Sequence, residues 1–322
     1  MSASIARQVR ILSLEGGGIR GAFTASVLAA FERATGKRVL DHFDLIVGTS
    51  TGGLIAIALG LGKSAAEILS FYQNAGPQIF GSNLLVRALR SVRHWVIAKH
   101  SAGPLKSSLL SFFGSDSTLE DSRARLVIPA FDATSGKPTC FKTPHHPRLR
   151  IDRARRAWEV GMATSAAPTF FPPYCSSWGT TYVDGGIWAN RPSLVGIVEA
   201  LQYLDYQQEE IHLLSIRTPG SQFRLPKMAI NGRIPWIRKG RLIEIIFGAN
   251  GAAATFDGQI LLGDRFLEIA ADSGISPISL DDATQLDSLK GLGEEAARTN
   301  LDRVANAFFA NPVTPACFDT RA

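Results

Sequence analysis

Apolar and polar positions in the first 62 residues follow the same order twice. Val9–Leu14 is a strand-length apolar run that enters a glycine turn, and Thr24–Ala34 then places its apolar residues at helical spacing. Phe43–Val47 is a second short apolar run that enters a second glycine turn, followed by the apolar helical segment Leu54–Leu61. Strands that alternate with helices in this way predict a parallel sheet covered by helices.

The rest of the chain continues this pattern less regularly. Leu126–Phe131 and Ile211–Ile216 are further predicted strands, and Ile243–Phe247 fits either a strand or a helix. Pro168–Tyr174 is rich in proline and is predicted to be a loop. Internal repeats, low-complexity tracts and convincing linkers are missing from the sequence, so we expect residues 1–322 to form a single α/β domain.

Composition narrows the class of protein. Apolar residues make up 45% of the 322 positions and charged residues 19%, as in ordinary globular proteins, which excludes a disordered chain, a coiled coil and a collagen-like fibre. The longest apolar run, Leu54–Leu61, falls well short of the roughly 20 residues needed to span a bilayer. The N-terminus resembles no secretory signal, and the three widely spaced cysteines suit a reducing compartment and match no metal-site spacing. These features predict a cytoplasmic protein.

Basic charge is concentrated in two segments. The net charge is +6, and the stretch from Gly81 to Ser115 holds five Lys/Arg residues but no Asp or Glu. Around Arg87–Arg93, cations and apolar residues occupy separate helical faces, which fits either a helix that rests on anionic lipid or a surface helix packed on the core. A second basic stretch, residues 233–241, includes Trp236 and could bind phosphate or a nucleotide. DNA and RNA are not expected partners.

The second glycine turn contains a candidate nucleophile. Gly48-Thr49-Ser50-Thr51-Gly52 has the G-x-S-x-G spacing and lies between a predicted strand and a predicted helix. In that context the serine sits on a sharp turn, with its hydroxyl exposed and a helix N-terminus behind it. The alternative is a Gly/Ser turn that only packs closely against the sheet.

The first glycine turn, Gly16–Gly21, has two interpretations. Its G-x-G-x-x-G spacing after a strand fits a dinucleotide-binding loop, but the acidic residue expected about 20 positions later should end the second strand, and Asp41 precedes that strand. Alternatively, the backbone N–H groups of Gly16, Gly17 and Gly18 form an oxyanion hole. The serine turn 30 residues later favours this second interpretation. Arg20 within the turn is expected to pair with a carboxylate.

The sequence offers a carboxylate as the base for Ser50. None of the six histidines lies in a position typical of a catalytic base: His212 falls inside a predicted strand, and His145 and His146 fall in a basic loop expected at the surface. Asp184 ends the strand-like run Thr181–Asp184 and precedes two glycines. The residues thus suggest a two-residue Ser–Asp arrangement, although Asp-Gly-Gly alone is more often a turn.

Taken in order, these motifs resemble the patatin-like phospholipase family. The matching pieces are Leu14–Gly21, Gly48–Gly53, Ala163–Pro172 and Asp184–Gly186, and the resemblance spans residues 9–218, with 219–322 as a C-terminal helical extension. Glu15 stands where the family commonly has Asp. The resemblance implies a three-layer α/β/α fold with a nucleophile elbow. It also implies Ser50 as nucleophile, Asp184 as general base and the Gly16–Gly18 turn as oxyanion hole, supported by Arg20, Gly21, Gly48, Gly52, Gly185 and Gly186, with no metal or cofactor.

The resemblance also implies an activity. Such an enzyme would cleave fatty-acyl esters of membrane phospholipids through an acyl-enzyme, at the inner face of the membrane. Some bacterial members are switched on by cyclic nucleotides in antiphage defence, which makes a cyclic nucleotide a candidate activator here. The alternatives are a nucleotide-binding protein that uses Gly16–Gly21, and a lipid-binding regulatory protein without turnover on the same fold.

Overall fold

A single mixed sheet organises the chain. The computed structural model describes residues 7–81, 98–220, 241–271, 278–314, 316 and 318. The strands run in the order β5-β6-β3-β2-β1-β7-β8, and β4 also pairs with β3. The pairs β1–β2, β1–β7, β2–β3 and β7–β8 are parallel, whereas β3–β4, β3–β6 and β5–β6 are antiparallel. The strands are β1 (Val9–Leu14), β2 (Leu45–Gly48), β3 (Arg125–Asp132), β4 (Lys137–Lys142), β5 (Tyr174–Cys175), β6 (Thr181–Asp184), β7 (Ile211–Ile216) and β8 (Phe266–Ile269).

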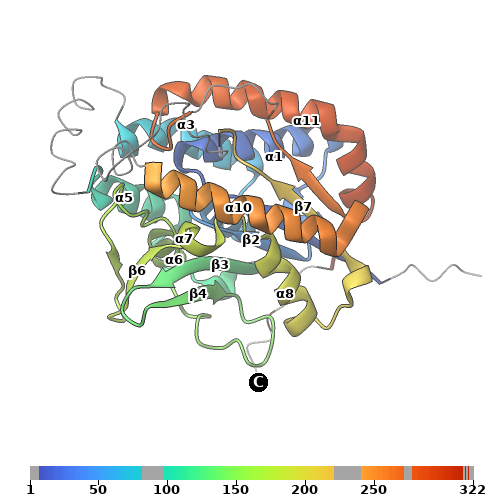
Figure 1. Cartoon of the computed structure of the whole chain (residues 1–322), viewed down its shortest axis with the longest axis horizontal. Helices are drawn as coiled ribbons and strands as arrows, with labels where there is room; N and C mark the ends of the chain where they lie inside the picture. The colour runs from blue at the N-terminus through green and yellow to red at the C-terminus, as the bar shows by residue number, and fades with distance from the viewer. Residues whose placement is uncertain are drawn as a thin grey trace, which may run out of the picture.

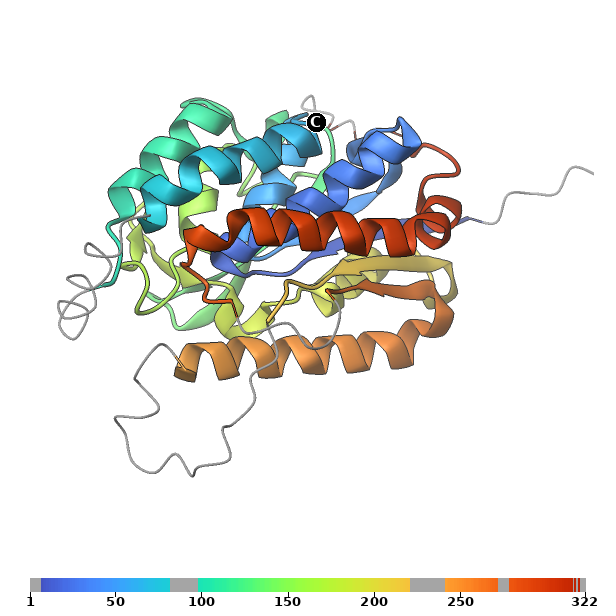
Figure 2. The ribbon, with the colours of Figure 1, turned by 90° about the horizontal axis from the view of Figure 1, so that it is seen from above.

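Helices cover both faces of this sheet (Figures 1 and 2). One face carries α1, α2, α3 and α11, and the other carries α8 and α10. This arrangement confirms the predicted three-layer α/β/α fold with a largely parallel sheet. The helices are α1 (Gly21–Thr35), α2 (Thr51–Gly60), α3 (Ala65–Phe80), α5 (Ala102–Phe113), α6 (Ala157–Thr164), α7 (Gly186–Ala189), α8 (Ser193–Tyr203), α10 (Arg241–Leu262) and α11 (Leu286–Phe308).

The sequence of β1 explains why both faces are covered. Leu12 and Leu14 belong to the core on the α1 side, whereas Val9 and Ile11 belong to the core on the α8 side. Both sides of this strand are therefore apolar, as is typical of a central parallel strand.

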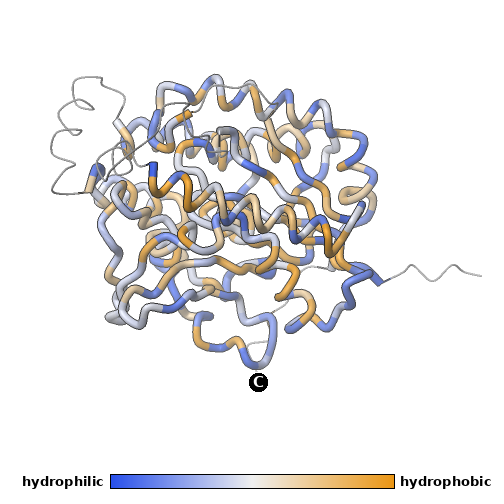
Figure 3. Tube along the Cα trace, viewed as in Figure 1, coloured by the Kyte–Doolittle hydropathy of each residue, from blue (hydrophilic) through white to orange (hydrophobic). Residues whose placement is uncertain are grey.

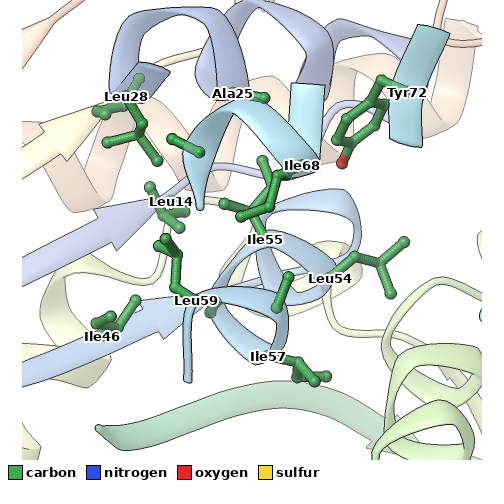
Figure 4. Packing of buried hydrophobic residues seen from close by; sticks show 14 of the residues in the cluster. Leu14, Ala25, Leu28, Ile46, Leu54, Ile55, Ile57, Leu59, Ile68 and Tyr72 are labelled. Atoms are coloured by element: carbon green, nitrogen blue, oxygen red, sulfur yellow. The ribbon is translucent and has the colours of Figure 1, made fainter. Parts of the chain in front are cut away.

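Helix α2 is buried on every side, which explains its uniformly apolar sequence. Figure 4 shows its side chains packed among those of neighbouring elements, with Ile55 directed toward Ile68 of α3. The Tyr72 hydroxyl of α3 donates a hydrogen bond to Thr51 O at the start of α2 (3.1 Å). The helix that follows the serine turn is thus fixed both by packing and by this hydrogen bond.

Several predicted elements are confirmed, some of them with ends shifted by a residue. β1 and β7 have the predicted bounds, and the predicted strand at residues 126–131 is one residue longer at each end. Ile243–Phe247, which fitted either structure, is helical within α10. The predicted loop at residues 168–174 ends one residue early, because Tyr174 pairs with β6.

The 219–322 part contributes to all three layers: β8 extends the sheet, and α10 and α11 cover its two faces. The predicted basic helix around Arg87–Arg93 lies outside the described residues, as does the basic stretch from 233 to 240. None of the helices described here is both long and apolar enough to cross a bilayer.

The end of α11 anchors this helix to the start of the chain. Phe308 is 1% exposed and stacks on Phe43 with ring centroids 5.5 Å apart. The Arg10 guanidinium donates to Phe308 O (2.9 Å). The C-terminal helix is therefore an integral part of the core that contains β1 and β2.

We expect Phe308→Ala to lower the free energy of unfolding by about 3–5 kcal/mol, because it leaves a cavity in a fully packed cluster. Chemical denaturation monitored by circular dichroism measures this loss. Ile151→Ala is the matched control, since the Ile151 side chain is 79% exposed and its truncation should change little. Equal effects of the two substitutions would contradict this account of the core.

Candidate active site

Ser50 occupies a strained turn between β2 and α2. Its backbone angles are φ 54° and ψ −125°, a region that residues other than glycine rarely adopt. A Cβ on Gly48 would lie 2.2 Å from Gly52 O, and one on Gly52 would lie 2.2 Å from Leu14 O. The two glycines of the predicted motif are therefore required by the close approach of backbones. The result is the predicted nucleophile elbow.

Asp184 lies at the end of β6, a strand that runs toward the Ser50 turn from the opposite direction to β2. Val127 of β3 pairs with both β2 and β4, and Ala130 pairs with both β4 and β6, so β2 and β6 lie on the same edge of β3. β2 is parallel to β3 and ends beside Val127, whereas β6 is antiparallel and ends with Asp184 beside Ala130. The carboxyl ends of the two strands thus approach each other head-on.

Residues 164–166 join these two strand ends. Thr164 Oγ1 accepts a hydrogen bond from Ser50 N (2.9 Å) and donates one to Pro129 O (2.6 Å), in the gap between β2 and β6. Asp184 N donates to Ala166 O (3.0 Å). The Ala163–Pro172 segment was noticed in the sequence only as a family resemblance. The structure gives it a physical role, because it positions both Ser50 and Asp184.

The Asp184 carboxylate is completely buried. Its Oδ1 accepts a hydrogen bond from Gly186 N (2.7 Å), while Oδ2 has no hydrogen-bond partner among the described residues. Burial raises the pKa of Asp184 to about 7, against the opposing influence of the nearby Ser50 hydroxyl and of Gly186 N. An acceptor oxygen without a donor and with a pKa near neutrality has the properties of a general base.

The glycine turn after β1 packs directly against Ser50. A Cβ on Gly16 would lie 3.0 Å from Ser50 Cβ, and one on Gly18, whose φ is +57°, would lie 2.1 Å from Leu280 O. Gly16 N donates to Asn190 O (3.0 Å) and Gly17 N to Thr51 Oγ1 (3.1 Å). No hydrogen bond from Gly18 N is found within the described part of the chain. Gly18 N is therefore the N–H group of this turn that is available to a ligand.

The charged residues next to this turn form structural ion pairs. Glu15 is fully buried and accepts hydrogen bonds from Thr218 N (2.7 Å) and from the Arg191 guanidinium (3.0 Å). Arg20 donates to Ile278 O (2.7 Å) and lies 3.6 Å from the Glu244 carboxylate. The expected pairing of Arg20 with a carboxylate is thus present. A Cβ on Gly21 would lie 2.5 Å from the Tyr72 hydroxyl, so Gly21 allows α1 to pack against α3.

A pocket opens beside Ser50. Its lining includes Ser50, Gly17 and Gly18. Most of the other lining residues are apolar, and they include Leu54, Phe80, Leu105, Phe170, Phe171 and Phe247. A pocket of this kind suits an apolar chain whose polar end lies at Ser50.

Within the described residues, no histidine is hydrogen-bonded to Ser50 or Asp184. The prediction that His145 lies at the surface is wrong. Its side chain is fully buried and hydrogen-bonded to Thr143 Oγ1 (2.8 Å) and to the Glu199 carboxylate (3.0 Å), because β4 and α8 enclose it. Groups of three or more His, Cys, Asp or Glu able to hold a metal ion are likewise missing from the described ranges.

Comparison with known proteins gives consistent matches. The sequence model of patatin-like phospholipases matches residues 12–196. A cGAMP-activated phospholipase of Escherichia coli is 32% identical to this chain, over an alignment that covers 96% of this chain and 94% of that protein. A cGAMP-activated phospholipase of Pseudomonas aeruginosa is 33% identical, over an alignment that covers 90% of this chain and 88% of that protein. A cGAMP-activated phospholipase of Vibrio cholerae is 37% identical, over an alignment that covers 70% of this chain and 68% of that protein.

We expect Thr164→Val to slow the reaction of Ser50 with a fluorophosphonate probe by about tenfold, because it leaves Ser50 N without its acceptor. Thr164→Ser keeps the hydroxyl and should keep most of the rate. Thr143→Val is the matched control, since Thr143 is equally buried and its Oγ1 accepts a backbone hydrogen bond from Leu126 N (2.9 Å). A normal labelling rate in Thr164→Val would show that this hydrogen bond does not orient Ser50.

The raised pKa of Asp184 predicts the pH dependence of the same reaction. As the pH falls below about 7, the buried carboxylate becomes protonated and can no longer accept the Ser50 proton. The labelling rate should therefore fall about tenfold for each pH unit below 7 and level off above it. A rate that stays constant down to pH 5 would exclude a base with this pKa.

Proposed function

This chain belongs to the patatin-like phospholipase family, and from that premise we propose that it cleaves acyl esters of membrane phospholipids with Ser50 as nucleophile and Asp184 as base. Its activity class is that of a lipid acyl hydrolase. The observation that carries the proposal is that Ser50, on its strained elbow at the wall of an apolar pocket, lies beside the buried Asp184.

The proposed reaction has two steps. Asp184 takes the proton of the Ser50 hydroxyl as Oγ attacks the ester carbonyl, and it then passes this proton to the lysolipid oxygen as the ester C–O bond breaks. Water, activated by the same carboxylate, then hydrolyses the acyl-enzyme and releases the fatty acid. Asp184 is suited to both steps because its pKa of about 7 makes it a stronger base than an exposed aspartate.

The oxyanion hole belongs to the Gly16–Gly18 turn in this proposal. Gly18 N donates directly to the developing charge, because Gly16 N and Gly17 N already have acceptors. The first turn of α2 adds the N–H of Thr51, which has no acceptor inside its own helix. Gly16 and Gly17 act by allowing the turn to lie close to Ser50. Such a donor contributes about 2.7–4 kcal/mol to transition-state stabilisation.

The proposal also names a substrate, a membrane phospholipid, and an activator, a cyclic nucleotide. The aromatic pocket suits a fatty-acyl chain, and the phospholipid would be reached at the inner membrane face, where a positive net charge favours anionic headgroups. Three relatives are named cGAMP-activated phospholipases, which supports a cyclic nucleotide as activator of this chain and a role in antiphage defence.

Fatty-acid release from mixed anionic phospholipid vesicles, with and without cGAMP, tests the proposal. Wild type should release fatty acid, with a higher rate when cGAMP is present. Ser50→Ala and Asp184→Ala should each lower the rate by at least a thousandfold, because each removes one half of the dyad. Ser111→Ala, which removes an exposed serine on α5, is the control and should retain full activity.

The outcomes separate the parts of the proposal. Release that persists in Ser50→Ala would exclude the dyad. Release that depends on Ser50 but not on cGAMP would keep the hydrolase and exclude this activator. Binding of vesicles or cGAMP without turnover, and without labelling of Ser50, would favour a regulatory protein on the same fold.

A further inference from the structure

Helix α10 has an unusually apolar solvent-facing side. Asp257 is the one charged residue among its exposed positions, and two half-exposed charged residues, Arg241 and Glu244, lie in its first turn. Four large side chains on this side have high exposed fractions: Leu242 (45%), Ile246 (36%), Phe256 (63%) and Ile260 (67%). Apolar colour continues along most of α10 in Figure 3, and Figure 2 shows α10 as the outermost element on its face of the sheet.

The inner side of α10 packs on the core, and this packing stabilises the helix. It does not account for the apolar residues on the outer side. Phe247, Ala254 and Leu262 face the core. Asn250 Nδ2 donates to Gly186 O (2.8 Å), and Asn250 Oδ1 accepts from Asn190 N (2.9 Å). The inner side thus packs on the core and on the active site, while the outer side has no partner within the described chain.

The outer side carries a heptad-like stripe. Residues 242, 246, 249, 253, 256 and 260 are Leu, Ile, Ala, Ala, Phe and Ile, and all six are exposed. Their spacing of 4, 3, 4, 3 and 4 residues is that of the contact positions of a coiled coil. From Leu242 to Ile260 the stripe covers 18 residue steps, or about 27 Å of helix. The spacing is that of any helix face, but a face in contact with water alone has no physical reason to be apolar at all six positions.

The stripe is also symmetric about its own centre, Gly251. A second α10 laid antiparallel about that centre brings Leu242 opposite Ile260, and Ile246 opposite Phe256. Ala249 then lies opposite Ala253, where two small side chains allow the helices to approach closely. Large residues meet large ones and small residues meet small ones, so the surface is complementary to itself. A two-fold symmetric dimer requires such self-complementarity.

We propose that α10 is the interface of a homodimer in which two copies of this chain pack the outer sides of their α10 helices antiparallel, across a two-fold axis that passes between the helices at the level of residue 251. A second copy fits better than a membrane, because interfacial helices carry Lys or Arg along the length of their apolar face, whereas α10 has Arg241 in its first turn and beyond it only Asp257 among its exposed positions. Antiparallel packing also places the N-terminus of each helix dipole beside the C-terminus of the other. This inference does not rest on the proposed function.

Analytical ultracentrifugation over a concentration series tests the interface. Wild type should sediment as a dimer, and Phe256→Glu should sediment as a monomer at the same concentrations, because it buries two unpaired carboxylates between the helices. Ile151→Glu adds the same charge at an exposed apolar residue between β4 and α6 and should remain dimeric. Both variants should keep the circular dichroism spectrum of wild type, since both side chains point into solvent.

Disulfide trapping tests the orientation. With Cys175→Ser removing an exposed thiol, a mixture of Leu242→Cys and Ile260→Cys proteins should form a mixed disulfide, whereas neither protein alone should do so, because like residues lie about 27 Å apart in the antiparallel pair. Disulfides formed by each protein alone would overturn the antiparallel arrangement. A monomeric wild type, or a dimer unaffected by Phe256→Glu, would overturn the interface. Loss of vesicle binding in Phe256→Glu with a monomeric wild type would assign the stripe to a membrane instead.

Discussion

The site depends on the way β2 and β6 share one edge of β3. A parallel strand and an antiparallel strand end opposite each other across Ile128 and Pro129, so two carboxyl ends that are 136 residues apart in the chain, Gly48 and Asp184, come together. Ordinary doubly wound sheets place functional loops at one edge of parallel strands. Here one antiparallel strand reverses that direction and delivers a carboxylate directly to the serine turn.

Because the ends of β2 and β6 face each other inside the fold, the Asp184 side chain is buried. Asp184 has no exposed surface and one of its oxygens has no donor, which disfavours its charged form and raises its pKa to about 7. Holding such a carboxylate charged at pH 8 costs roughly 4 kcal/mol relative to water. The strained backbone of Ser50 adds a further cost of about 1–3 kcal/mol. The packing around the site offsets these costs: α2 is fully buried behind Ser50, and Thr164 accepts the hydrogen bond of Ser50 N.

Helix α10 belongs to the site as much as the strands do. Its inner side supplies Phe247 to the pocket and Asn250 to the turn after Asp184, and the Gly251 carbonyl accepts a hydrogen bond from Arg191. A contact on the outer side of the same helix is therefore only one helix diameter, about 10 Å, from the groups that hold the base and the oxyanion turn. Any shift of this helix would be transmitted to Gly186 and Asn190 directly.

The sequence alone determined the local geometry of this protein. Gly18 has a positive φ, and a Cβ on Gly48 would meet Gly52 O inside the same turn, so local sequence is enough to account for both glycines. Strand-length patterns likewise predict β1 and β7 to the residue. Only the tertiary structure decided which distant groups meet. Thr164 beside Ser50, His145 buried against Glu199, and the raised pKa of Asp184 all depend on packing between segments far apart in the chain. Local sequence patterns encode backbone conformation and the face that is buried, whereas hydrogen-bond partners and desolvation arise only when the layers of the fold come together.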